Sequence, residues 1–266
     1  MRGRDGVVVT GAGRGMGAEI ARALAADWVV GVLDRDEEAA ASSARSIGRD
    51  AVPLVADTTD AAGVDAALDR FAEVVGAPPR GFVANAGVVR FGPLLDLAEA
   101  DWRSVVEVNL TGTFVSVRAA ARRMAAGEGG SIVTVTSMNG VAPGPNAGAY
   151  AATKAGIARL TQQMALEWAP LGIRANAVAP GLIDIGMAEA IYADPDVRRR
   201  REHAVPIGRL GTGTDVASVV RFLLSDAAAY VTGAELLVDG GVTMSVIAGL
   251  PRPREVDSVG PDDGPS

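Results

Sequence analysis

The chain has 266 residues, of which 48% are hydrophobic and only 4% aromatic, and it carries a formal net charge of −7. A chain of this length can bury a large core, whereas its acidic balance and few aromatic side chains argue against nucleic-acid binding. It has no cysteine and a single histidine, so disulfides, thiol nucleophiles and metal centres built from these residues are not expected.

The amino terminus combines a short apolar strand with a glycine-rich turn. Residues 6–10 are mostly valine, the sequence TGAGRGMG overlaps their end, and a helical pattern runs from Ala18 to Ala26. Glycines let the backbone approach a ligand, and the first amide groups of a helix attract a pyrophosphate. The residues of this predicted dinucleotide site are Gly11, Gly13, Arg14, Gly15, Met16 and Gly17.

The second predicted strand, residues 28–33, leads directly into Asp34. A carboxylate at this position can accept hydrogen bonds from both hydroxyls of an adenosine ribose and would repel a 2′-phosphate, which favours NAD. Arg14 or Arg35 could hold a 2′-phosphate if Asp34 turned away, so NADP stays possible.

Strands and helices alternate along the rest of the chain. The further strands are predicted at 51–56, 81–84, 131–136, 173–179 and 236–238, and the helices at 37–47, 61–75, 100–126, 150–169 and 214–225. This alternation predicts right-handed crossovers and a parallel sheet, hence a single-domain, doubly wound α/β fold. Asp57-Thr58 and Asn85-Ala86-Gly87 follow two of these strands, where such sheets bind ligands.

The helix that begins near Tyr150 carries a pair of residues with coupled chemistry. Tyr150 and Lys154, the only lysine in the chain, lie four residues apart and share one helix face. An ammonium roughly 5 Å from the phenol, at an effective dielectric constant of about 20, favours the phenolate by ~3 kcal/mol and so lowers the tyrosine pKa toward neutrality. With the Ser137 hydroxyl to bind the substrate oxygen, these side chains predict a site that interconverts a carbonyl and an alcohol.

Together these motifs resemble the short-chain dehydrogenase/reductase family. The resemblance covers residues 6–241 and depends on TGAGRGMG, Asp57, Asn85-Ala86-Gly87, and the spacing from Ser137 to Tyr150-x-x-x-Lys154. It implies a Rossmann-fold domain over residues 1–250, a substrate loop at about 184–204, and a homotetramer. The Pro/Gly/Asp-rich stretch 251–266 is expected to be a separate tail.

The resemblance also implies residue roles. Tyr150 is the acid/base, Lys154 lowers its pKa and holds the nicotinamide ribose, Ser137 orients the substrate oxygen, and Asn109 completes a proton relay through water. The further cofactor-binding residues implied are Asp34, Arg35, Asp57, Thr58, Asn85, Ala86, Gly87, Pro180, Gly181 and Ile183. Asn139 and Leu182 are expected beside the substrate, with Ser137 and Tyr150.

Two features of the second half leave questions open. The family commonly has a cofactor-binding threonine where Ile185 stands, so an apolar wall is expected there. The run Arg198 to Arg201 could receive a phosphate of an acyl carrier or coenzyme A, although a solvated helix face is the simpler interpretation.

The sequence therefore predicts a dehydrogenase that transfers a hydride between NAD(H) and a secondary alcohol or ketone, with a hydrophobic or cyclic substrate favoured. The alternatives are an NADPH-dependent 3-oxoacyl reductase and a non-catalytic, dinucleotide-sensing regulator. The apolar run near the amino terminus is too short for a signal peptide or a membrane span, which predicts a soluble, cytoplasmic protein.

Overall fold

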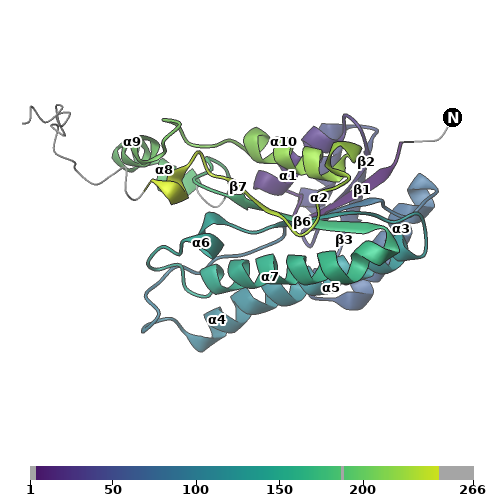
Figure 1. Ribbon diagram of the computed structural model, residues 1–266, viewed down its shortest axis with the longest axis horizontal. Helices are drawn as coiled ribbons and strands as arrows, with labels where there is room; N and C mark the ends of the chain where they lie inside the picture. Colours follow the sequence, from purple (N-terminus) through teal and green to yellow (C-terminus); the bar gives the residue numbers. More distant parts are fainter. Residues whose placement is uncertain (1–3, 187–188, 246–266) are drawn as a thin grey trace, which may run out of the picture.

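The computed structural model describes residues 4–186 and 189–245, and their strands form one seven-stranded parallel sheet (Figure 1). The strand order is β3-β2-β1-β4-β5-β6-β7, which reverses direction between β1 and β4. The strands are β1 (Gly6–Thr10), β2 (Val29–Asp34), β3 (Ala51–Val55), β4 (Gly81–Ala84), β5 (Gly130–Val135), β6 (Ile173–Pro180) and β7 (Glu235–Val238). The predicted doubly wound α/β fold is confirmed.

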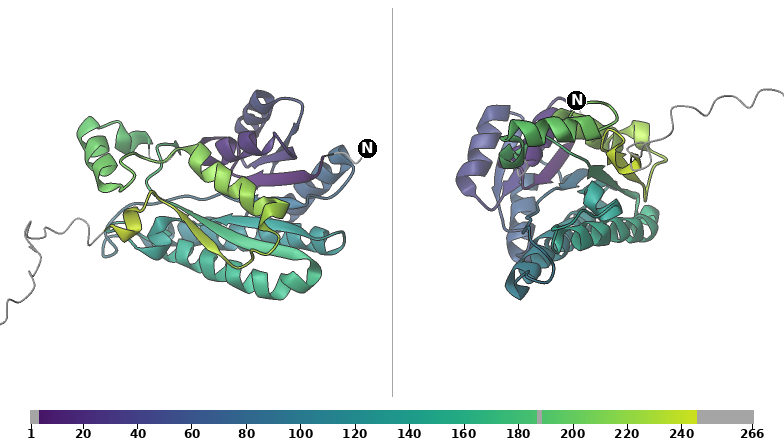
Figure 2. Two further views of the ribbon diagram at one scale, coloured as in Figure 1. Left: turned by 45° about the horizontal axis from the view of Figure 1, so that its top comes forward. Right: turned by 90° about the vertical axis from the view of Figure 1, so that its left-hand side faces the viewer.

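Helices cover both faces of the sheet (Figure 2). The longer helices are α1 (Gly15–Leu24), α2 (Glu37–Ile47), α3 (Ala61–Val75), α4 (Glu99–Val106), α5 (Gly112–Ala125), α7 (Tyr150–Trp168), α9 (Pro195–Ala204) and α10 (Gly213–Leu224). The short elements are α6 (Met138–Val141), α8 (Glu189–Tyr192), the π-helical turn η1 (Glu107–Thr111), and the 3₁₀ turns η2 (Ala169–Leu171), η4 (Asp226–Ala228) and η5 (Val242–Met244). Among the described residues, no helix is both long enough and apolar enough to cross a membrane.

The pleat of the strands divides the core between the two faces. In β1, Val7 and Val9 pack with helices α1, α2 and α10, whereas Val8 faces the layer made by α3, α5 and α7. All three valines are fully buried, because a parallel sheet covered on both sides leaves neither strand face to solvent. This explains why the central strands are continuous apolar runs rather than alternating ones.

The elements differ from the sequence prediction in three places. The helix predicted at 100–126 is interrupted by η1, which contains Asn109. The sequence predicts no element between the strand at 131–136 and the helix at 150–169, whereas the structure has the short helix α6 there, with Ser137 as its N-cap. Helix α1 begins at Gly15, three residues before the predicted start.

Part of the predicted carboxyl-terminal organisation lies outside the described residues. This applies to the tail at 251–266 and to most of the preceding apolar stretch, of which η5 is described. The single domain over residues 1–250 stays a prediction.

The ring of Phe71 on α3 is central to one half of the core. It is fully buried, and a Cβ atom added to Gly31 of β2 would lie 2.9 Å from the ring. We expect Phe71→Ala to lower the free energy of unfolding by about 3–5 kcal/mol, because the cavity cannot be refilled by neighbouring strands. Urea denaturation measures the loss, and Phe222→Ala, at a residue that is 41% exposed on α10, is the matched control. Equal losses in the two variants would contradict this account of the core.

Candidate active site

A cavity of about 790 Å³ opens at the carboxyl ends of the strands. Its walls come from the loops after β1, β2, β3, β4, β5 and β6, which meet at one edge of the sheet. Every residue predicted to bind cofactor or substrate lines this cavity except Gly13, and the predicted relay residue Asn109 lies behind the wall. A single space therefore brings these residues together, as expected from the topology of a doubly wound sheet.

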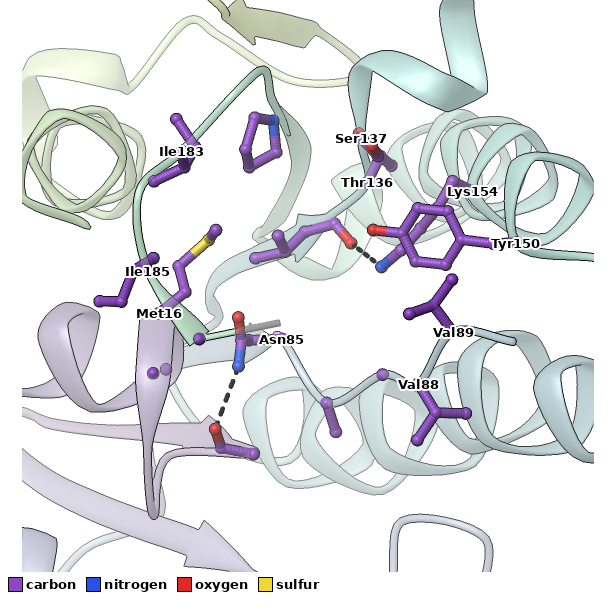
Figure 3. A pocket seen from close by; sticks show the side chains of 18 of the residues that line it. Met16, Asn85, Val88, Val89, Thr136, Ser137, Tyr150, Lys154, Ile183 and Ile185 are labelled. Atoms are coloured by element: carbon purple, nitrogen blue, oxygen red, sulfur yellow. Dashed lines mark hydrogen bonds between the residues drawn. The ribbon is translucent and has the colours of Figure 1, made fainter. Parts of the chain in front are cut away.

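Helix α7 presents Tyr150 and Lys154 to the cavity from consecutive turns (Figure 3). The Lys154 Nζ atom lies 5.5 Å from the centre of the Tyr150 ring and donates a hydrogen bond of 2.7 Å to the carbonyl oxygen of Val135. Lys154 is only 3% exposed, and this burial lowers its pKa to about 8. The group still carries its proton for the most part at neutral pH, and it has two further N–H bonds to donate.

The predicted effect on the tyrosine is wrong in direction. Burial raises the pKa of Tyr150 above its ordinary value, and a hydrogen bond with the Ser137 hydroxyl opposes that rise without reversing it. The sequence argument included the charge of Lys154 but not the desolvation of the phenol. Desolvation disfavours the phenolate, and it dominates here.

The Ser137 hydroxyl is held in place by the start of α6. Its Oγ atom accepts a hydrogen bond of 3.2 Å from the backbone N–H of Asn139, and the side chain is 7% exposed. Since this bond occupies an acceptor position, the hydroxyl proton is available to the phenol or to a substrate oxygen. In Figure 3 Ser137 and Tyr150 lie on the same side of the cavity.

Asn109 is fully buried in the π-helical turn η1. Its Oδ1 atom accepts a hydrogen bond from the Val88 N–H at 2.8 Å, and its Nδ2 group donates to the Val88 carbonyl at 3.0 Å and to Thr153 Oγ1 at 3.2 Å. The side chain thus fixes the loop after β4 to α7 and makes no direct hydrogen bond to Lys154. A relay through water stays a prediction.

The glycine-rich turn forms a cradle of bare backbone that has no room for side chains at Gly13 and Gly17. A Cβ atom at Gly17 would clash with the carbonyl oxygen of Gly11, and one at Gly13 would lie 2.8 Å from Asp34 Oδ2. Asn85 fixes this turn to β4, since its Nδ2 group donates to the carbonyl oxygens of Thr10 and Gly11 at 3.0 and 3.2 Å (Figure 3). A bare backbone at the start of α1 is what a pyrophosphate requires, so the residues present fit a dinucleotide.

The adenosine end of the cavity contains Asp34, Arg35, Asp57 and Thr58. The Asp34 carboxylate accepts hydrogen bonds from the backbone N–H groups of Gly13 at 3.0 Å and Asp36 at 3.1 Å. The Asp57 carboxylate accepts hydrogen bonds from the backbone N–H and the hydroxyl of Thr59. These bonds, the backbone one most of all, hold the pKa of that carboxyl below its usual value despite its partial burial. This end therefore presents two fixed carboxylates.

The other end of the cavity contains residues that the sequence argument did not single out. Asn139 and Leu182, expected beside the substrate, line the cavity, as do Pro180, Gly181 and Ile183, which the sequence predicts to bind cofactor. Ile185, where an apolar wall is predicted, also lines it, beside Met16 in Figure 3. The additional wall residues include Val88, Val89, Phe91, Ile191, Tyr192 and Arg201. Of these, Arg201 belongs to the arginine run seen in the sequence, but only the three-dimensional arrangement shows which arginine of the four reaches the cavity.

Comparison with known proteins agrees with this geometry. A family profile described as enoyl-(acyl carrier protein) reductase matches residues 11–243. The chain is 40% identical to 2-(S)-hydroxypropyl-CoM dehydrogenase 3 of Xanthobacter autotrophicus, with 89% of this chain and 96% of that protein covered. It is 42% identical to cis-4-hydroxycyclohexanecarboxylate dehydrogenase of Sinomonas cyclohexanicum, with 89% and 95% covered.

A solved structure shows the same likeness. The gluconate 5-dehydrogenase of Burkholderia cenocepacia, in complex with NADP and tartrate, superposes with a TM-score of 0.86 at 37% identity. The match covers 92% of this chain and 97% of that one.

The lowered pKa of Lys154 can be measured directly, because the chain has no other lysine. Protein grown with lysine labelled with ¹³C at Cε should give one side-chain resonance that titrates near pH 8. A midpoint above pH 10, as for an exposed lysine, would contradict the burial of a charged amine at this position.

The same shift predicts how stability depends on pH. In the unfolded chain the lysine holds its proton up to about pH 10.4, so between pH 8 and that value the unfolded state binds more protons and stability rises with pH. The penalty relieved is about 3 kcal/mol for a shift to a pKa of about 8. Chemical denaturation at pH 7 and pH 10 should show this gain in the wild type relative to Lys154→Met, and an identical pH dependence in both proteins would contradict it.

Proposed function

Because this chain belongs to the short-chain dehydrogenase/reductase family, we propose that it transfers a hydride between NAD(H) and a hydrophobic or cyclic secondary alcohol or its ketone. The reaction class follows from its relatives, which are named as dehydrogenases of hydroxy compounds, and one similar structure contains NADP. The observation that carries the proposal is the convergence of Ser137, Tyr150 and Lys154 on one cavity beside a glycine cradle.

The side chains divide the chemistry as follows. When bound, the nicotinamide accepts a hydride from the alcohol carbon, or donates one to the ketone carbon in reverse. In oxidation the Tyr150 oxygen takes the hydroxyl proton, and Ser137 donates a hydrogen bond to the substrate oxygen. Lys154 stabilises the phenolate that Tyr150 must become, and its two remaining N–H bonds suit the ribose hydroxyls.

The hydrogen bonds and ion pairs of the charged side chains at the adenosine end support the preference for NAD. Asp34 is fixed by two backbone N–H groups rather than turned away, and the Arg14 guanidinium pairs with Asp36 at 2.8 Å. A 2′-phosphate would meet the Asp34 carboxylate and would have to draw Arg14 from its partner. One similar structure contains NADP, so this preference is proposed for this chain alone.

The same contacts weaken the two alternatives. An NADPH-dependent 3-oxoacyl reductase would use Arg14, Arg35 and the 198–201 run to bind phosphates. In the structure Arg14, Arg198 and Arg199 already have carboxylate partners. A dinucleotide-sensing regulator needs no acid/base group. The complete set of Ser137, Tyr150 and Lys154 argues for catalysis.

A homotetramer is also proposed, with apolar side chains on the outer layer as its support. Trp102 on α4, Phe114 on α5 and Leu166 on α7 are exposed on the helices that cover one face of the sheet. Exposed apolar side chains grouped on neighbouring helices are typical of association surfaces. The cytoplasmic location expected from the sequence stays a prediction.

Removal of the phenol tests the catalytic assignment. We expect Tyr150→Phe to lower kcat for alcohol oxidation by roughly 10²- to 10⁴-fold, because the ring stays but the proton acceptor is lost. Fluorescence titration with NADH should show nearly unchanged cofactor affinity. Tyr230→Phe, at a fully exposed tyrosine, makes the same chemical change and should leave turnover intact. Substantial activity in Tyr150→Phe would remove this tyrosine from the mechanism.

Substitution of Asp34, at the end of β2, tests the choice between NAD and NADP. Asp34→Ala removes the carboxylate that opposes a 2′-phosphate, so the ratio of kcat/KM for NADP to that for NAD should rise by about tenfold or more. Thermal unfolding is measured in parallel, since two backbone hydrogen bonds to this carboxylate are also lost. An unchanged ratio in a folded variant would show that Asp34 does not discriminate between the cofactors.

A further inference from the structure

The four consecutive arginines of α9 have different surroundings in the structure. Arg198 pairs with Asp184 at 2.6 Å and with Glu202 at 3.0 Å, and Arg199 pairs with Asp196 at 2.7 Å. Arg200 is exposed and donates to the carbonyl oxygen of Asp196. The fourth member, Arg201, is turned to the cavity, so the run is not one phosphate-binding surface.

Arg201 is half-buried in the cavity wall against an aromatic ring. Its guanidinium carbon lies 5.6 Å from the centre of the Tyr192 ring, and Tyr192 is only 5% exposed. Among the described residues, no carboxylate pairs with this guanidinium. A cation–π contact attracts the charge to the ring face but leaves the N–H donors of the guanidinium free to bind another group.

The surroundings make this cation distinctive. The other charged residues that line the cavity are Arg14, Asp34, Arg35 and Asp57, at the adenosine end, and Lys154. Around the substrate end the wall is apolar, with Val88, Val89, Phe91, Met138, Leu182 and Ile191. In such a setting a guanidinium that faces the ligand binds an oxyanion through charge-assisted, often bidentate hydrogen bonds.

We propose that the alcohol substrate carries a single negative charge, in the form of a carboxylate, and that Arg201 binds it. The inference rests on the proposed function, because it concerns the substrate of that same site. The Arg201 guanidinium carries one positive charge and can neutralise the single negative charge of a carboxylate. A phosphate ester carries close to two negative charges, and among the described residues this end of the cavity offers only that one guanidinium to balance them. The apolar wall then holds the carbon skeleton between Arg201 and Tyr150.

The test uses the full chain with NAD and pairs of cyclic secondary alcohols that differ only in bearing a carboxylate or a carboxamide. The wild type should show a kcat/KM roughly 10- to 100-fold higher for the carboxylates. Arg201→Gln should remove this preference mainly through a raised KM for the carboxylates, with a much smaller loss for the carboxamides. Arg200→Gln, one residue away on the exposed side of α9, is the matched control and should retain the preference.

The possible outcomes separate this inference from the proposed function. Wild-type turnover of carboxamides without preference for carboxylates, or equal losses for both in a folded Arg201→Gln variant, would overturn the role of Arg201 and leave the dehydrogenase assignment standing. A phosphate ester as the best substrate of the panel would overturn the single-charge argument. Failure of the wild type to oxidise any alcohol of the panel would overturn both. Thermal unfolding of each variant identifies losses that come from misfolding.

Discussion

The burial of one ammonium group constrains the whole site. The Lys154 side chain is buried, and among the described residues its ammonium group has one hydrogen-bond partner, the carbonyl oxygen of Val135 at the end of β5. Helix α6 packs closely against it, since a Cβ atom at Gly140 would lie 2.9 Å from the Lys154 carbonyl carbon. The lysine side chain is only 3% exposed, and its ammonium lies 5.5 Å from the centre of the Tyr150 ring. The desolvation that lowers the lysine pKa to about 8 also raises that of the tyrosine, so the two pKa values, which lie close together in water, move apart in the folded protein.

Hydrogen bonds between loops keep this arrangement rigid before any ligand binds. Asn85 connects the end of β4 to the glycine-rich turn. Asn109 connects the loop after β4, at Val88, to Thr153 of α7. The Asn85 amide donates to carbonyl oxygens at the end of β1 and in the turn, and the Asn109 amide donates to the Val88 carbonyl and the Thr153 hydroxyl, so both amides are satisfied. The cradle for the cofactor and the acid/base group are therefore positioned by the same network, which favours a preorganised site over one assembled on binding.

The parts of this structure that depend on local patterns could be predicted from the sequence. Buried parallel strands are apolar runs, and the loops after them meet at one edge, so the fold and most cavity residues follow from strand order alone. Other features depend on residues far apart in the chain. The π-helical turn at Asn109, the helix that begins after Ser137, and the effect of burial on Tyr150 all arise from packing between elements. No local pattern distinguishes Arg201 from its three neighbours, because only the carboxylates nearby decide which arginines are neutralised.

The charged groups at the two ends of the cavity differ, and this difference connects cofactor choice to substrate choice. Arg14 and Arg35 accompany the carboxylates at the adenosine end, whereas Arg201 has no carboxylate partner among the described residues. Asp34 and Asp57 present carboxylates where the adenosine ribose would lie, and hydrogen bonds keep Asp57 ionised. Arg201 presents a cation at the other end, on a helix that the ion pair between Arg198 and Asp184 fixes to the loop after β6. An anionic substrate, as proposed, gains more at the second end, where the cation has no carboxylate partner among the described residues, than at the first. A chain with a net charge of −7 can therefore still bind a negatively charged substrate at one defined place.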